Sequence, residues 1–176
     1  PSLASITNVD LRRDVWAGQS EAAGNNVLIN VNGAVTSNGG TVIGRLLNLT
    51  VASDSSVSTK VSNLTANVTG TGQPLTISET DGLTIDPAGI TNQNGDVNLY
   101  AIGDIDGANG IIRAQNLDVS ANSALLTTLI KRLTGSFGAG GGDGLNVTQT
   151  GDLTIGENGI GSSGDPIAIN VVGGNL

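Results

Sequence analysis

The sequence predicts an all-β chain wound as a parallel β-helix, also called a β-solenoid. Three observations predict this fold class. Aliphatic residues recur in short apolar–polar–apolar triplets that are followed directly by Gly, Asn or Asp. Aromatic residues make up only 2% of the 176 residues, too few for an ordinary globular core. The chain also carries a long internal repeat with no gap in its alignment.

The triplets have the spacing of short strands with one buried face. In a strand, residues i and i+2 point to one side and residue i+1 to the other. Glycine, asparagine and aspartate then supply the tight turns that follow. We therefore expect these ten triplet residues to be buried: Leu75, Ile77, Leu83, Ile85, Leu145, Val147, Leu153, Ile155, Ile167 and Ile169.

The internal repeat spans about 70 residues. The stretch PLTISETDGLTIDPAGITNQNGDVNLYAIGDI (74–105) aligns without a gap on GLNVTQTGDLTIGENGIGSSGDPIAINVVGGN (144–175). Matched positions are apolar, Thr or Gly, such as Gly89 on Gly159, whereas polar positions such as Glu79, opposite Gln149, look free to vary. This pattern indicates a repeated fold and not a repeated catalytic site.

The repeat also divides the chain into two regions. A weaker match at a slightly shorter shift extends it upstream, so the chain holds roughly two and a half copies. Residues 1–24 repeat poorly and are predicted to be a cap, a linker or an assembly strand. Residues 25–176 are predicted to be the β-solenoid repeat region.

Coil dimensions follow from the triplet spacing. Three short strands with their turns take roughly 20–25 residues, so one repeat unit would hold three coils and the chain seven or eight. Residues 70 apart should then superpose three coils further along the stack. At about 4.8 Å per coil the rod would be roughly 35–40 Å long. A slim interior of this kind suits Val, Ile and Leu and excludes large rings.

Two alternatives stay open at this point. A β-sandwich also has short strands at regular spacing, although sandwiches seldom carry an ungapped long repeat and usually keep an aromatic core. Two tandem sandwich domains of about 70 residues are a weaker option. Within the solenoid, residues 122–133 (NSALLTTLIKRL) have apolar residues at helical spacing, but the counterpart in the repeat fits a helix poorly. We expect buried strands there.

One stretch has the residue types of a metal site. Asp104, Asp106 and Asn109 place two carboxylates and an amide close together, as a calcium loop would. The stretch departs from the EF-hand pattern because Gln115 stands where the bidentate Glu is needed. The simpler interpretation is a polar turn between coils. We therefore expect no ion to be essential, with these three residues as the weak calcium candidate.

The composition argues against catalysis. The chain has no histidine and no cysteine, and its acids form no cluster of the kind that polysaccharide-cleaving solenoids use. The glycine-rich run GAGGGDG (138–144) lacks the Lys-Ser/Thr of a phosphate-binding loop and is typical of a flexible loop. We predict that the protein is not an enzyme and that it has no catalytic or cofactor-binding residues.

Charge and hydropathy exclude two further partners. The net charge is −8 and only 12% of residues are charged, whereas nucleic-acid binding needs a basic surface. No apolar run approaches the length that spans a bilayer, so membrane insertion is not expected.

Two stretches carry a family resemblance. GDLTIGENGIGSSGDPIAINVVGGNL and ISETDGLTIDPAGITNQNGDVNLYAIGDI resemble the repeats of filamentous-haemagglutinin-like adhesins, large bacterial surface exoproteins. The resemblance covers most of residues 24–176 and implies a parallel β-helix that extends from the cell surface. It also implies a stalk without catalytic residues, so no site is carried over.

The function expected from this resemblance is a structural rod of an extracellular, cell-surface adhesin or filament. Its partners would be adjacent repeats or other copies of the chain, arranged head to tail. Whether the chain is a fragment of a large adhesin or a small subunit stays open. The alternative is a binding module that presents a flat solenoid face to host or surface glycans, or to ice. Aligned Thr ranks would suit ice, but Asp118, Asn146 and Ala168 interrupt them.

Overall fold

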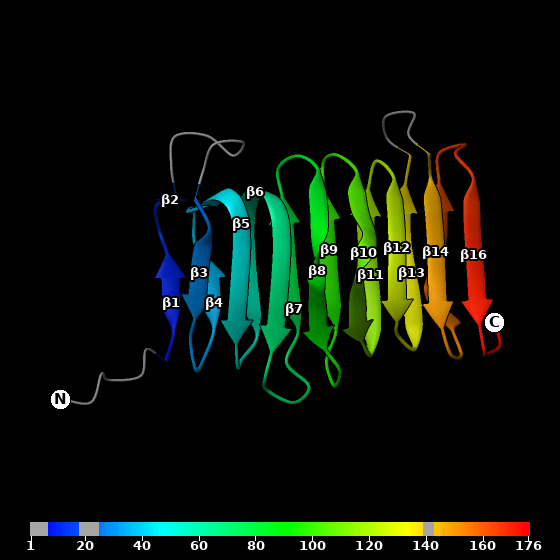
Figure 1. The fold of residues 1–176 in the computed structure, drawn as a ribbon, viewed down its shortest axis with the longest axis horizontal. Coiled ribbons are helices and arrows are strands. Elements are labelled where there is room, and N and C mark those ends of the chain that lie inside the picture. The colour runs from blue at the N-terminus through cyan, green and yellow to red at the C-terminus, as the bar shows by residue number, and fades with distance from the viewer. Residues whose placement is uncertain (1–6, 18–24, 139–142) are drawn as a thin grey trace.

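Parallel strands stacked along one axis form the computed structural model, which describes residues 7–17, 25–138 and 143–176. Its strands join into one 16-stranded sheet, and each strand pair in the described residues is parallel. No helix occurs in these three ranges. The architecture is a β-solenoid of about 7 turns, a rod whose strands cross its long axis (Figure 1). The predicted fold class is confirmed, and the sandwich is excluded because its sheets are antiparallel.

The strands follow one another at short intervals. In chain order they are β1 (Val9–Leu11), β2 (Val15–Trp16), β3 (Val27–Asn30), β4 (Val35–Ser37), β5 (Val42–Val51), β6 (Ser55–Val68), β7 (Leu75–Glu79), β8 (Leu83–Asn92), β9 (Val97–Ala101), β10 (Ile105–Ala114), β11 (Asn116–Ala121), β12 (Ala124–Leu129), β13 (Arg132–Phe137), β14 (Leu145–Thr150), β15 (Thr154–Ser162) and β16 (Ile167–Val172).

Two stacks of strands form the sides of the rod. Stack A contains β7, β9, β11, β13 and β15, and stack B contains β8, β10, β12, β14 and β16. The long strand β6 starts in stack A, where it pairs with β7, and ends in stack B, where it pairs with β8. Each strand is therefore connected to the next strand of its own stack through the strand of the other stack. This arrangement supplies the long crossover that parallel pairing requires.

The coils differ in length along the rod. The coil that brings Leu75 into register with Val97 is among the longer ones, and the coil from Leu117 to Leu133 is among the shorter ones. From β7 onward a coil has two strands and not the predicted three, because two triplets share one strand. In β8, Leu83 and Ile90 lie on either side of a register shift, so the strand bends at a bulge instead of ending.

The interior is a continuous column of aliphatic side chains, several from each coil. Val, Ile, Leu and Ala from both stacks form one continuous buried cluster along the rod. Each fully buried aliphatic side chain contributes about 1.5–3 kcal/mol relative to exposure. Phe137 is the one large ring in this cluster, at 2% exposure. The slim, aliphatic interior accounts for the scarcity of aromatic residues.

Burial was predicted correctly except at the C-terminal end of the rod. Seven of the ten triplet residues are buried: Leu75, Ile77, Leu83, Ile85, Leu145, Val147 and Leu153. Ile155 and Ile169 are only partly buried, and Ile167 is 43% exposed. The prediction is wrong at these three positions because they belong to β15 and β16, the last strands of their stacks. Within the described residues no further coil covers them.

The expected superposition of residues one repeat unit apart is also wrong. Leu75 lies in stack A, where its partners along the rod are Val97, Leu117, Leu133 and Ile155. Leu145 lies in stack B, in register with Ala124 and Ile167. A shift by one repeat unit therefore moves a residue to the opposite side of the rod instead of a whole number of coils along it. The sequence repeat relates the two stacks because both have the same strand-and-turn pattern.

The stretch 122–133 forms strands, as expected. Its residues belong to β12 and the start of β13, with no helical turn. Leu125 and Leu129 are 44% and 47% exposed, so the apolar residues at helical spacing do not share one buried face. Leu126 and Leu133 point into the interior instead, in keeping with strand alternation.

Part of the poorly repeating N-terminal segment stacks on the rod. β1 pairs in parallel with β4, and β2 pairs with the start of β5. Residues 1–6 and 18–24 lie outside the described residues, as do residues 139–142 of the glycine-rich run.

Candidate functional site

The predicted calcium candidate lies at the start of β10. Asp104 ends the turn after β9, Asp106 stands on the outer face of β10, and Asn109 is exposed in the bulge of that strand. Asp104 Oδ1 accepts hydrogen bonds from Asn122 Nδ2 at 3.0 Å and from Ser123 Oγ at 2.7 Å. Asp106 Oδ1 accepts one from the backbone N–H of Ala108 at 3.0 Å. Asp104 therefore ties its turn to the neighbouring coil, whereas Asp106 holds the backbone of its own strand at the bulge.

The acids of the described ranges do not gather into a metal-binding group. Within them no set of three or more His, Cys, Asp or Glu residues is placed to hold an ion. Asp143 and Asn146 border the same hollow as Asp104 and Asp106, which has a volume of about 450 Å³. The calcium assignment of Asp104, Asp106 and Asn109 stays a prediction, now with a structural role for each carboxylate.

Removal of divalent metal is expected to leave the fold intact. The aliphatic cluster and the parallel ladders run the length of the rod and hold the coils together by apolar packing and backbone hydrogen bonds. Thermal unfolding followed by circular dichroism, with and without EDTA, should give the same Tm within about 2 °C. A large drop in Tm would contradict this expectation and make Asp104 and Asp106 the first residues to replace.

A second region involves a buried carboxyl group that the sequence analysis misjudged. Glu79 and Gln149, which looked free to vary, are 3% and 1% exposed. The alternation of β7 places residue 79 inward after Leu75 and Ile77, and β14 places Gln149 inward in the same way. Continuing the alternation by one step would have identified both positions.

Each of these two side chains binds a backbone group of the preceding coil. Glu79 Oε2 accepts a hydrogen bond from the N–H of Val61 in that coil at 3.1 Å, and Oε1 accepts one from the N–H of the adjacent Thr80 at 2.9 Å. Gln149 Oε1 accepts from the N–H of Ile130 at 3.2 Å, and Nε2 donates to the Ile130 carbonyl at 2.8 Å. Both residues bond to the preceding coil near the point where their strand ends and the chain crosses to the other stack.

Burial changes the acidity of Glu79. It raises the pKa of Glu79 to about 7, although hydrogen bonds from Val61 and Thr80 favour the charged form; the nearby Asp81 carboxylate also raises it. Asp81 forms an ion pair with Lys60 of the preceding coil, with 3.9 Å between Nζ and Oδ2. Both side chains of this pair are more than 40% exposed, so the pair itself contributes little.

The raised pKa predicts a stability that falls with increasing pH. Between pH 4.5 and about 7 the unfolded chain has lost the Glu79 proton while the folded chain keeps it, so each step upward disfavours folding. The loss should reach about 3 kcal/mol above pH 7. Urea unfolding measured between pH 4.5 and pH 8 checks this expectation.

Matched variants isolate the contribution of Glu79. Glu79→Gln should remove most of the slope, because Gln149 shows that an amide fits the equivalent place. Gln149→Glu should introduce a new slope of the same sign. A pH dependence that is unchanged in Glu79→Gln would assign the effect to other groups.

The C-terminal end of the rod is the third region of interest. β15 pairs only with β13, and β16 only with β14, so each has one edge without a strand partner in the described residues. Core-type residues are partly uncovered there: Ile167 is 43%, Val172 is 49% and Leu176 is 70% exposed. Unpaired strand edges beside exposed apolar residues favour pairing with a further strand.

Comparison with known proteins gives no assignment, because no protein-family model, no curated protein and no solved structure matches this chain. The structure bears out the parallel β-solenoid that the haemagglutinin-like resemblance implies. In the described parts of the chain, no helix is long and apolar enough to cross a membrane.

Proposed function

We propose that this chain is a non-catalytic structural segment of an extracellular rod, such as the stalk of a surface adhesin or a filament. The observation that carries the proposal is the last coil, which combines two unpaired parallel strand edges with partly exposed core residues. A further coil stacked on it would bury Ile155, Ile160 and Ile169 as earlier coils bury their counterparts.

The solenoid architecture supports a role in spanning distance. Each coil contacts mainly its neighbours, so length is added without changing the cross-section. Under this proposal further coils stack on the last one and extend the rod. They come from the same chain or from another copy placed head to tail. A head-to-tail contact does not close on itself and generates a fibre.

The haemagglutinin-like resemblance supplies the proposed location, which is the cell surface or the extracellular space. The proposal assigns no catalysis and no cofactor to the chain. Its partners are adjacent coils or copies of the protein and, on one face of the rod, a glycan.

Self-association of the isolated 176-residue chain tests the proposal. Light scattering should show a mass that increases with protein concentration, and electron microscopy should show rods of variable length. Ile167→Lys should reduce the association, because it places a charge on the inner side of the last strand.

A matched control separates the end of the rod from its sides. Leu125→Lys changes a side chain of nearly equal exposure, 44% against 43%, in the middle of the rod. This variant should associate like the unmodified chain. A monomer at all concentrations, or equal effects of the two substitutions, would overturn the role of the open end.

A further inference from the structure

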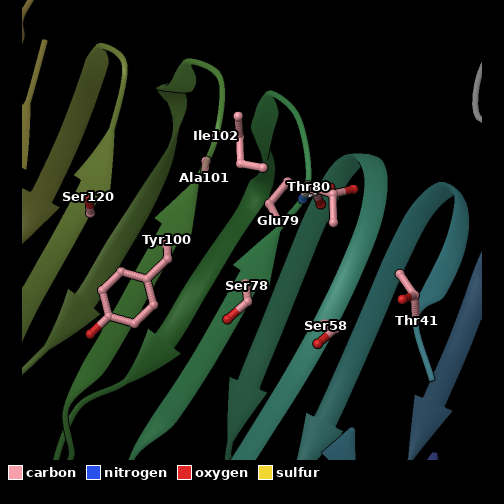
Figure 2. Close-up of a pocket in the computed structure, with 9 residues that line it drawn as sticks. All are labelled: Thr41, Ser58, Ser78, Glu79, Thr80, Tyr100, Ala101, Ile102 and Ser120. Carbon is pink, nitrogen blue, oxygen red and sulfur yellow. Dashed lines mark hydrogen bonds between the residues drawn. The ribbon is translucent and has the colours of Figure 1, made fainter. Parts of the chain in front are cut away.

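A groove crosses the outer surface of stack A where its strands end. It has a volume of about 410 Å³ and takes its lining from successive coils, including Ser58, Ser78, Tyr100 and Ser120 (Figure 2). A second hollow of about 230 Å³ shares Ile102 and Ser120 with it and continues to Ser136. The two hollows therefore lie next to each other along the rod, and together they are called the channel below.

The floor of the channel is a row of hydroxyl groups set by the strand register. Ser58 pairs with Ser78, Ser78 with Tyr100, Tyr100 with Ser120, and Ser120 with Ser136. Neighbouring parallel strands lie about 4.8 Å apart, so the serine side chains follow one another at a regular spacing on either side of Tyr100, whose hydroxyl is turned to Asp118. The serines offer donors and acceptors to an extended ligand.

Tyr100 is the only aromatic residue in this row, and the fold does not require it there. Its register neighbours on both sides, Ser78 and Ser120, are serines. Its hydroxyl lies 3.2 Å from Asp118 Oδ2 and donates to it, while the residue remains 38% exposed. Burial, followed by the Asp118 carboxylate, raises the pKa of Tyr100, which keeps the donating proton in place. The ring is thus an anchored, solvent-facing platform.

The wall of the channel adds an apolar contact. Ile102, in the turn after β9, is 76% exposed and stands above Tyr100 in the close-up (Figure 2). The ring of Tyr100 extends away from Ile102 in this view, so the two residues offer separate apolar surfaces to the C–H faces of a ligand. Hydroxyl groups beneath suit the polar edges of the same ligand.

The charges of the channel disfavour an acidic ligand. Among the described residues no Lys or Arg lines either hollow, whereas the Asp118 carboxylate holds Tyr100. An anionic polysaccharide would therefore meet no basic partner there and would approach the Asp118 carboxylate.

We propose that the channel binds an extended, uncharged glycan that runs along the rod, with a sugar ring stacked on Tyr100 and sugar hydroxyls bonded to the serine row. The site adds a binding role to the proposed rod and does not depend on how the rod is extended. A pyranose has apolar C–H faces and an equatorial belt of hydroxyls, which is the combination that the channel offers.

Cellohexaose and the hexamer of N-acetylglucosamine serve as neutral probes, and a polygalacturonate hexamer as the anionic control. Two-dimensional amide NMR of the full chain should show shifts at Tyr100, Ile102 and Ser120 with at least one neutral probe. The anionic control should cause none. Absence of shifts with both neutral probes, or shifts confined to other faces, would overturn the proposal.

Two substitutions test the role of the ring. Tyr100→Ser restores the serine of the neighbouring coils, so it should preserve the fold while weakening binding by about tenfold or more. Tyr100→Phe keeps the ring and should bind within about threefold of the unmodified chain. Tm measurements confirm that both variants are folded. Unchanged binding by Tyr100→Ser would overturn the assignment and leave the self-association test untouched.

Discussion

Leu83→Asp is expected to unfold the rod or to leave it barely stable. The Leu83 side chain is 3% exposed and lies in the aliphatic interior at the start of β8. The change removes buried apolar area, which costs about 2–5 kcal/mol, and places a carboxylate where neither water nor a cation reaches it. The total is comparable to the whole stability of an ordinary domain, about 5–15 kcal/mol.

Urea unfolding followed by circular dichroism measures this effect, with Leu28→Asp as the control. Leu28 is a strand residue that is 72% exposed, so the same substitution there should change the free energy of unfolding by less than about 1 kcal/mol. Similar losses in the two variants would contradict the inward orientation of Leu83 and, with it, the register of stack B.

Gly89→Ala is expected to destabilise the protein by about 2–5 kcal/mol, and Gly159→Ala by only about 1–2 kcal/mol. Both glycines adopt left-handed backbone angles, with φ of 75° and 68°. Alanine strains the backbone equally at the two positions. At Gly89, however, the added Cβ would lie 2.3 Å from the carbonyl oxygen of Ile111, in the next coil.

The difference between the two glycines comes from their places in the rod. Gly159 belongs to β15, the last strand of stack A, and an added Cβ there meets no atom within 4 Å. Denaturant unfolding of both variants gives the comparison directly. Equal destabilisation would show that backbone strain dominates and that the neighbouring coil can move aside.

Self-association would change the effect expected for Gly159→Ala. If a further coil or copy covers β15, the site of Gly159 becomes as crowded as that of Gly89. Under conditions where the chain associates, Gly159→Ala should then reduce association as well as stability. Association and stability measured on Gly159→Ala together report whether a further coil stacks over Gly159 in β15.

The local pattern was predictable because it depends on residues close together in the sequence. Strand alternation makes Leu75 and Ile77 point inward wherever the strand lies, and the glycines and asparagines after them form turns. The scarcity of aromatic residues indicated a slim interior, because composition alone shows that large rings do not fill the core. These properties favoured the parallel solenoid over a sandwich and were sufficient for most of the buried residues.

The functional surfaces depend on which strands become neighbours. The hydroxyl row around Tyr100 exists only because coils of unequal length bring Ser78, Tyr100 and Ser120 into register. No fixed sequence spacing marks such a row, since turn and bulge lengths differ from coil to coil. The calcium candidate shows that the reverse also holds. Asp104 and Asp106 are close in sequence, but each carboxylate accepts hydrogen bonds from other groups of the protein.

By itself the sequence determined that this chain is all-β, that its short strands are buried on one face, and that its interior is aliphatic. Those features follow from side-chain alternation and turn chemistry, which act over a few residues. Tertiary structure decided the assignment of strands to two stacks, the hydrogen-bond partners of Glu79 and Gln149 in the preceding coil, and the open edge at β15 and β16. These depend on the register between coils, which is set by packing between strands that a whole coil of intervening chain separates in the sequence.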